Sequence, residues 1–222
     1  MRYMTSRLAA RRHTLSQIVR YYGPRPSRLP DVIRWVQSRG DIAIDSRVPW
    51  WPFVAADAVA ERLPDGARVF EYGGGGSTLW LQDCGANVTA VEHDVDWHRV
   101  LQERAPAADV ILQVPSQEGS VPTAVHPGQY FDEYVTTISG FPDASFDIVI
   151  VDGRARVACG LAAMPKVRPG GMLLLDDSDR SKYAGLRGAL VGWFRTDYRG
   201  LKPGGGPPCQ TSVWIRPASD LI

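Results

Sequence analysis

From residue 68 onward, the chain alternates short, solidly apolar segments with longer segments of helical spacing. Turn residues separate them, as at Pro64-Asp65-Gly66 and Pro169-Gly170-Gly171. Solidly apolar strands separated by helices are typical of a parallel sheet that is covered on both faces. The pattern predicts strands at 68–72, 87–92, 110–114, 146–151, 172–175 and 211–215, and helices at 77–84, 95–104, 130–138, 155–167 and 183–194. We therefore expect an α/β fold with a doubly wound, mostly parallel sheet and a long loop at 115–129.

The N-terminal part of the chain follows a different pattern. Helical spacing runs through residues 1–40, with a break at Gly23-Pro24 and a stop at Gly40. An aromatic segment that begins at Pro49 then leads into a helix at 53–63. The sequence therefore predicts an N-terminal helical arm at 1–48 and a second domain at 49–222.

The charge balance limits the possible partners. Lys and Arg total 25 against 24 acidic residues, which gives a net charge of +1. Nucleic-acid-binding proteins usually carry a strong basic excess, so we expect no nucleic-acid partner. The first 39 residues hold nine arginines and a single acid, Asp31. Such an arm is either a solvated basic surface or a docking site for an acidic partner, and the sequence leaves both open.

The cysteines and the apolar segments bear on the compartment. Cys84, Cys159 and Cys209 lie far apart without metal-ligand spacing, as expected of reduced thiols in an intracellular protein. No apolar run approaches the roughly 18 residues of a membrane span. The arginine-rich N-terminus lacks the apolar segment of a secretory signal. We expect a cytoplasmic protein with no membrane span.

A glycine-rich turn, Glu71–Ser77, follows the strand at 68–72. Glycines let the backbone approach a ligand closely, and the next helix presents free N–H groups. Glu92, with His93 beside it, ends the next strand about 20 residues later, where an acid can accept hydrogen bonds from ribose hydroxyls. The functional interpretation is a nucleotide-derived cofactor, and a purely structural turn is the alternative.

These segments resemble motifs I and II of class I S-adenosylmethionine-dependent methyltransferases. The resemblance covers residues from about 50 to 216 and implies a Rossmann-like, seven-stranded sheet with S-adenosyl-L-methionine as the cofactor. It implies that the methionine end and the ribose of the cofactor are held by Glu71, Gly73, Gly75, Ser77, Glu92, His93 and Asp152. The family often places an acid near the adenine, but Val114–Gln117 lacks one, so the adenine contacts stay open. The family often dimerises through N-terminal helices, which implies a homodimer.

A nicotinamide dinucleotide would use a similar glycine turn. The charge of Glu71 argues against it, because a carboxylate at this place would repel a pyrophosphate. The methionine end of S-adenosyl-L-methionine carries an ammonium group and tolerates the acid. We therefore favour a methyltransferase.

Three further acids follow neighbouring strands. Asp152 ends the strand at 146–151, and Asp176 and Asp177 follow the strand at 172–175. Crowded carboxylates suit Mg²⁺ or another divalent metal. The arrangement resembles catechol-type O-methyltransferases, in which a metal chelates the acceptor hydroxyl and Asp152 would be a catalytic ligand. The chain departs from that family, with Asp177 in place of asparagine and Ala155 in place of lysine. Capping of the next helix by Asp176 or Asp177 is the alternative.

Aromatic residues and one histidine are candidates for the acceptor site. Trp50, Trp51 and Tyr130 lie in regions that border the acceptor pocket in this family, and aromatic faces suit sugar rings. Core packing is the alternative for the tryptophans. His126 is the candidate general base, although a loop histidine is more often simply exposed.

The leading hypothesis is methyl transfer to a hydroxyl of a small-molecule acceptor, a sugar or oligosaccharide, assisted by a divalent metal. The segments 151–156 and 211–214 resemble small bacterial methyltransferases that tailor sugars, such as those of methylmannose polysaccharide synthesis. One alternative is a metal-independent general-base enzyme that acts on a phenolic or antibiotic scaffold. Another is a cofactor-binding partner subunit without catalysis.

Overall fold

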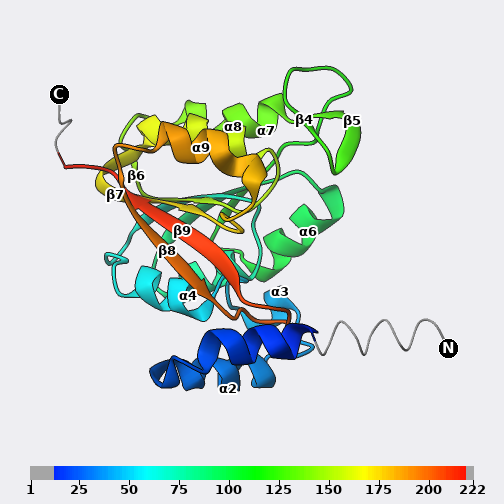
Figure 1. Cartoon of the computed structure of the whole chain (residues 1–222). Coiled ribbons are helices and arrows are strands. Elements are labelled where there is room, and N and C mark those ends of the chain that lie inside the picture. Colours follow the sequence, from blue (N-terminus) through cyan, green and yellow to red (C-terminus); the bar gives the residue numbers. More distant parts are fainter. Residues whose placement is uncertain (1–12, 219–222) are drawn as a thin grey trace.

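Seven strands form the central sheet in the computed structural model, which describes residues 13–218 (Figure 1). The strands are β1 (Arg68–Tyr72), β2 (Asn87–Glu92), β3 (Asp109–Leu112), β6 (Phe146–Val151), β7 (Val167–Leu175), β8 (Phe194–Gly200) and β9 (Cys209–Ile215). Their order is β3-β2-β1-β6-β7-β9-β8. The first five are parallel, whereas β9 runs antiparallel to both β7 and β8. This topology confirms the predicted mostly parallel, seven-stranded α/β fold.

Helices cover both faces of the sheet. The N-terminal arm is helical at 13–22 and in α2 (Leu29–Gln37). The helices that follow are α3 (Ala43–Ser46), α4 (Phe53–Ala60), α5 (Gly76–Asp83), α6 (Val95–Arg104), α7 (Asp132–Thr136), α8 (Arg156–Ala163) and α9 (Ala184–Ala189), with short 3₁₀ segments at Pro26–Arg28, Thr137–Gly140, Met164–Lys166 and Ser181–Tyr183. Helices α7, α8 and α9 lie on one side of the sheet, and α4 lies on the other (Figure 1). Among the residues that the structure describes, no helix is long and apolar enough to cross a membrane.

Burial on both faces explains the solidly apolar strands. Successive side chains of β1 alternate, so that Phe70 joins the cluster under α7 and α8, and Val69 joins the cluster under α4. Val149 and Ile148 of β6 divide in the same way. All four side chains are fully buried, so neither face of these strands tolerates a polar pattern.

Two expectations about the outer parts of the fold are wrong. The segment 115–129 is not a plain loop, because β4 (Pro122–Thr123) and β5 (His126–Tyr130) form a small hairpin. The helix expected at 183–194 ends at Ala189, and β8 follows it. β8 pairs only with β9 and is mostly exposed, so its sequence carries no apolar run that would mark it as a strand.

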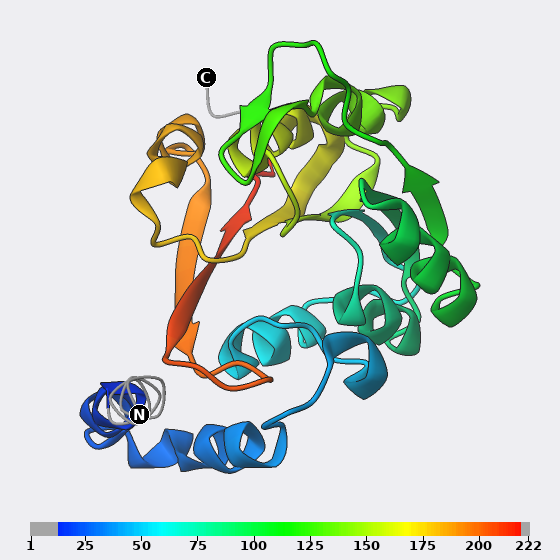
Figure 2. The same cartoon turned by 90° about the vertical axis from the view of Figure 1, so that its right-hand side faces the viewer.

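The described part of the N-terminal arm packs against the sheet domain (Figure 2). Ile18, Tyr22 and Trp35 form a buried cluster with Phe53 and Leu201. The hydroxyl of Tyr22 accepts a hydrogen bond of 2.9 Å from the backbone N–H of Leu201. The first twelve residues of the predicted arm lie outside the described residues. The division at residue 48 and the homodimer stay predictions.

Candidate cofactor site

A cavity of about 670 Å³ opens where β1, β2 and β6 end. The glycine turn forms one wall, and residues that follow β2 and β6 form others. Of the predicted cofactor residues, those that line the cavity are Gly73, Gly75, Ser77, Glu92, His93 and Asp152. The carboxyl ends of parallel strands are where ligands bind in open α/β sheets. The cavity therefore lies where the sequence predicts a cofactor.

Glu71 supports the glycine turn from behind. Its side chain is fully buried and does not line the cavity. One carboxyl oxygen accepts a hydrogen bond from the Ser77 hydroxyl, and the other accepts one of 2.6 Å from the Thr78 hydroxyl. Thr78 in turn accepts a bond of 2.9 Å from the N–H of Gly75, so these contacts fix the first turn of α5.

The electrostatic state of Glu71 weakens one argument from the sequence. Burial raises the pKa of Glu71 to about 8, against the lowering effect of its bonds to Ser77 and Thr78. The carboxyl is therefore mostly neutral at pH 7. A neutral Glu71 neither repels a pyrophosphate nor favours the ammonium group of a methionine. The choice between the two cofactors must therefore rest on other residues.

Glu92 lines the cavity, and one of its two carboxylate oxygens already accepts hydrogen bonds from the chain. Its Oε1 accepts hydrogen bonds of 2.7 and 2.9 Å from the backbone N–H groups of His93 and Asp94. The Nδ1 atom of His93 lies 2.6 Å from the same oxygen. Within residues 13–218, Oε2 has no hydrogen-bond donor. The carboxylate is thus fixed in place and keeps an acceptor atom for a ligand.

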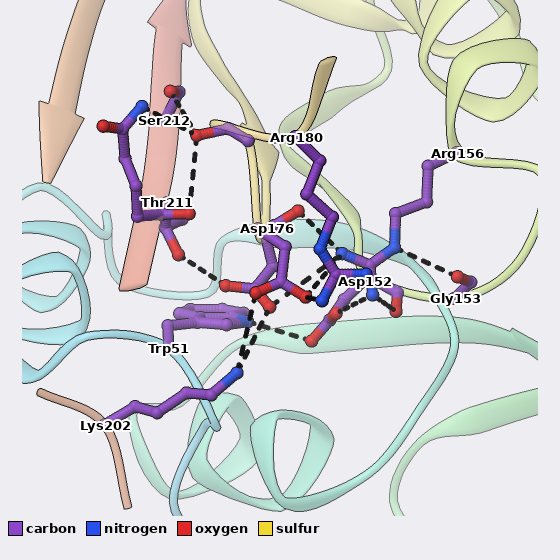
Figure 3. Close-up of polar contacts among 12 residues, drawn as sticks. Trp51, Asp152, Gly153, Arg156, Asp176, Arg180, Lys202, Thr211 and Ser212 are labelled. Atoms are coloured by element: carbon purple, nitrogen blue, oxygen red, sulfur yellow. Dashed lines mark hydrogen bonds and ion pairs between the residues drawn. The ribbon is translucent and has the colours of Figure 1, made fainter. Parts of the chain in front are cut away.

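Asp152 belongs both to the cavity and to a buried network of charges (Figure 3). Its carboxylate lies 2.7 Å from the guanidinium of Arg156 and accepts a hydrogen bond of 3.3 Å from the indole N–H of Trp51. Burial raises the pKa of Asp152, against the lowering effect of Arg156 and Lys202. The network holds Asp152 in a fixed position at the end of β6.

Asp176 also lies against cations (Figure 3), and Asp177 forms ion pairs with Arg180 and Lys202. Asp176 is buried and accepts a bond of 2.6 Å from Thr211, and Arg156 and Lys202 each lie 3.9 Å from its other oxygen. Asp177 accepts a bond of 2.5 Å from Arg180 and lies 3.8 Å from Lys202. Burial and the neighbouring Asp152 raise the pKa of Asp176.

These three carboxylates do not fit a divalent metal in this arrangement. Guanidinium and ammonium groups occupy the positions around them that a metal and its water ligands would need. Within the described part of the chain, no group of three or more His, Cys, Asp or Glu side chains is arranged to hold a metal ion. Asp176 and Asp177 do not cap a helix either, because the segment after them has no side-chain cap.

His126 lines the same cavity, on the hairpin that follows β3. Its Nε2 accepts a hydrogen bond of 3.1 Å from Nε of Arg154. Burial and the positive charge of Arg154 lower the pKa of His126. The ring is therefore neutral at pH 7, but the bond from Arg154 occupies the lone pair that a general base would use. Its role as a base stays a prediction.

The three aromatic candidates lie in different environments. Trp50 is 41% exposed and lines the cavity. Trp51 is fully buried, packs edge-on against Trp80 and reaches the site only through its indole N–H. Tyr130 ends β5 without lining the cavity. Trp50 alone among the three is placed to contact a ligand there.

Sequence reasoning missed the cations of this region. Arg156 stands four residues after Asp152, and Arg180 stands three residues after Asp177, so both spacings were visible in the sequence. Lys202 comes from the loop between β8 and β9, and no local pattern links it to β7.

Comparisons with known proteins concern the fold. No protein-family model matches the sequence, and no curated protein matches it. An O-methyltransferase from Bacillus cereus, solved with SAH, is 19% identical, with a TM-score of 0.50 over 72% of this chain and 77% of that chain. A methyltransferase-like protein from Silicibacter pomeroyi is 24% identical, with a TM-score of 0.49 over 78% of this chain and 91% of that one. The chain has the Rossmann-like fold of class I methyltransferases.

Proposed function

We propose that the protein transfers a methyl group from S-adenosyl-L-methionine to a hydroxyl of a small-molecule acceptor. The observation that carries the proposal is the carboxylate of Glu92. It lies at the end of β2, is held by two backbone N–H groups and keeps one oxygen for the cavity. A carboxylate in this place is suited to the paired hydroxyls of a ribose.

The glycine turn fits the remainder of such a cofactor. Gly73, Gly75 and Ser77 line the cavity beside Glu92, and a Cβ at Gly75 would meet no protein atom within 4 Å, so it would take up space in the cavity. Trp97 closes the turn, because its indole N–H donates a hydrogen bond of 2.9 Å to the carbonyl of Gly74. These residues form a rigid cradle for the methionine end of the cofactor.

When bound, S-adenosyl-L-methionine supplies a methyl group on a positively charged sulfur. The chain must then position the acceptor hydroxyl and take up its proton. Asp152 is the best placed residue for the proton, because its side chain is 22% exposed, lines the cavity and has a raised pKa. Arg156 positions Asp152 through their 2.7 Å contact. No step of this scheme needs a metal.

We propose a saccharide as the acceptor class, on the strength of the exposed indole of Trp50 beside the cavity. A phenolic scaffold is the second candidate. It is favoured by the apolar side chains of Val121, Val125 and Leu161, which line a neighbouring cavity.

Calorimetry with S-adenosylhomocysteine tests the cofactor. We expect saturable binding by the wild-type protein and a loss of roughly tenfold or more in Glu92→Gln, since the amide keeps the shape but not the charge. Glu103→Gln, at an exposed position of α6, is the matched control and is expected to bind normally. Binding of NAD⁺ in preference to S-adenosylhomocysteine would overturn the proposal.

Transfer of labelled methyl groups tests catalysis. With a panel of saccharides and phenols, Asp152→Asn is expected to lower the rate much more than it lowers cofactor affinity. Tight cofactor binding without methylation of any acceptor would instead favour the partner-subunit alternative. An unchanged rate in Asp152→Asn would remove Asp152 from the mechanism.

A further inference from the structure

A second cavity, of about 480 Å³, adjoins the cofactor cavity, and Gly153 and Arg154 line both. The β4–β5 hairpin forms one wall, and the first turn of α8 and the segment at 180–183 form the others. This second cavity therefore begins beside Asp152, where the proposed function needs room for an acceptor.

The charged side chains that line this second cavity are all positive. They are Arg154, Arg156, Arg180 and Lys182, and no aspartate or glutamate lines it. Arg156 and Arg180 are paired with Asp152 and Asp177. Within residues 13–218, neither Arg154 nor Lys182 forms an ion pair with a carboxylate. Among these residues, neither cation therefore has a carboxylate within ion-pair distance, and Arg154 acts on Asp94 only from farther away.

Arg154 is partly buried and uses little of its hydrogen-bonding capacity. Its Nε donates to His126, and its other guanidinium N–H groups have no acceptor among the described residues. Lys182 lies near the mouth, with its ammonium 5.0 Å from the ring centre of Tyr183. A guanidinium with free N–H groups suits the paired oxygens of a carboxylate, sulfate or phosphate.

The start of α8 adds to the positive potential. Its first residues, Arg156, Val157 and Ala158, line the cavity, and no side chain caps the helix. Ala155, at the N-cap position, has a φ of +47°, which is an uncommon conformation for a residue with a Cβ. Because the first turn of α8 lines the cavity, the positive end of the helix dipole faces the same space as Arg154 and Lys182.

We propose that this cavity binds the acceptor of the methyl transfer and that the acceptor carries an anionic group, held by Arg154 and Lys182. The proposal rests on the proposed function for the identity of the reaction, but the anion site is tested separately. Apolar side chains of Val121, Pro122 and Leu161 line the rest of the cavity, so the acceptor has an apolar face beside its charge. An acidic saccharide and an aromatic hydroxy acid both belong to this class.

The test compares two fluorescent probes of similar shape. 8-Anilinonaphthalene-1-sulfonate carries one sulfonate on an apolar body, and N-phenyl-1-naphthylamine is the same body without the charge. We expect the sulfonate probe to bind with one dominant site, and Arg154→Gln and Lys182→Gln each to weaken it by roughly tenfold. The neutral probe is expected to bind much more weakly and to respond to neither variant.

Two controls separate charge from packing. Arg154→Lys restores the charge, so it is expected to recover most of the affinity that Arg154→Gln loses. Arg62→Gln changes an exposed arginine that follows α4 and precedes β1, at the other end of the strands, and is expected to bind the probe normally. Equal binding of the two probes, or an unchanged affinity in both glutamine variants, would overturn the anion site.

Calorimetry with S-adenosylhomocysteine on the same variants keeps the two proposals distinguishable. Lys182→Gln is expected to retain cofactor binding, because Lys182 does not line the cofactor cavity. If the wild type bound the sulfonate probe at this site but not the cofactor, the anion site would stand and the proposed function would fall.

Discussion

Two glycines of the turn, Gly73 and Gly75, allow a structural role to be tested apart from a ligand-binding role. Gly73 has a φ of +88°, and a Cβ built there would lie 2.6 Å from the Cα of Gly153. Left-handed backbone costs a residue with a Cβ about 1–2 kcal/mol, and overpacking costs about 1–3 kcal/mol. Gly73→Ala is therefore expected to lose about 2–5 kcal/mol of unfolding free energy, which lowers the Tm by roughly 4–20 °C in a chain of this size.

Gly75 differs from Gly73 in both respects. Its φ is −179°, which is ordinary extended backbone, and no heavy atom lies within 4 Å of a Cβ built there. Gly75→Ala is thus expected to keep the wild-type Tm. The added methyl group would enter the cavity that Gly75 lines, so we expect S-adenosylhomocysteine affinity to fall by about 5- to 150-fold, the equivalent of 1–3 kcal/mol of overpacking.

Thermal unfolding and calorimetry on the same preparations measure both effects. Gly188→Ala is the control, because this helical glycine in α9 also has no heavy atom within 4 Å of a built Cβ. It is expected to gain about 0.5–1 kcal/mol of stability and to bind the cofactor normally. If Gly75→Ala bound S-adenosylhomocysteine as tightly as the wild type, the turn would be structural only and the cradle would be refuted.

Three further predictions concern charge. The pKa of Glu71 is about 8 in the folded chain, against an ordinary value of 4.5. The free energy of unfolding therefore falls as pH rises between these two values, because only the unfolded chain ionises the carboxyl readily. The whole loss is at most roughly 5 kcal/mol. Glu71→Gln should therefore gain stability relative to the wild type from pH 5 to pH 8 in urea unfolding without cofactor, and a constant difference would contradict this. Lys202→Met should lower the free energy of unfolding by about 1–3 kcal/mol at pH 8. The loss should be smaller at pH 5, because Asp176 has a raised pKa and is protonated there. An equal loss at both pH values would contradict this prediction. Mg²⁺ titrated into chelator-treated protein with S-adenosylhomocysteine should give no saturable heat, whereas saturable binding that is lost in Asp176→Ala would restore the metal hypothesis.

The parts of the fold that could be predicted from the sequence are those with a local cause. β1, β2 and β6 match their predicted ranges because burial on both faces forces an apolar run of defined length. Helix α6 also begins where expected, since the side chain of Asp94 accepts a 2.9 Å bond from the N–H of Trp97 and caps it. β8 has no such cause, because it is an exposed edge strand whose pairing depends on β9.

The residues of the candidate site also differ in whether a local sequence pattern could predict their positions. The position of Glu92 at the end of β2 is predictable because its distance from the glycine turn is a property of one strand–helix–strand unit, whereas its role toward a cofactor stays a prediction. The small hairpin that carries His126 and Tyr130 depends on pairing within a polar segment, which leaves no apolar pattern to read. Trp51 and Trp50 are neighbours in sequence, and only the tertiary packing, in which Trp51 is buried in the cluster under α4 and against Trp80, shows that Trp50 is the one that lines the cavity.

The carboxylates after β6 and β7 show why a cluster of acids does not by itself predict a metal. Adjacent parallel strands bring Asp152 and Asp176 together, and their mutual repulsion in a buried place demands positive charge. The sequence indicates that a positive charge is needed there, but it does not show which cation supplies it. Arg156 follows Asp152 by four residues and lies near the carboxylates at both strand ends. It therefore supplies the positive charge from within the same strand–helix unit. A divalent ion would have to displace Arg156 from the carboxylates of Asp152 and Asp176, which would leave this buried guanidinium with backbone carbonyl acceptors but no negative charge beside it.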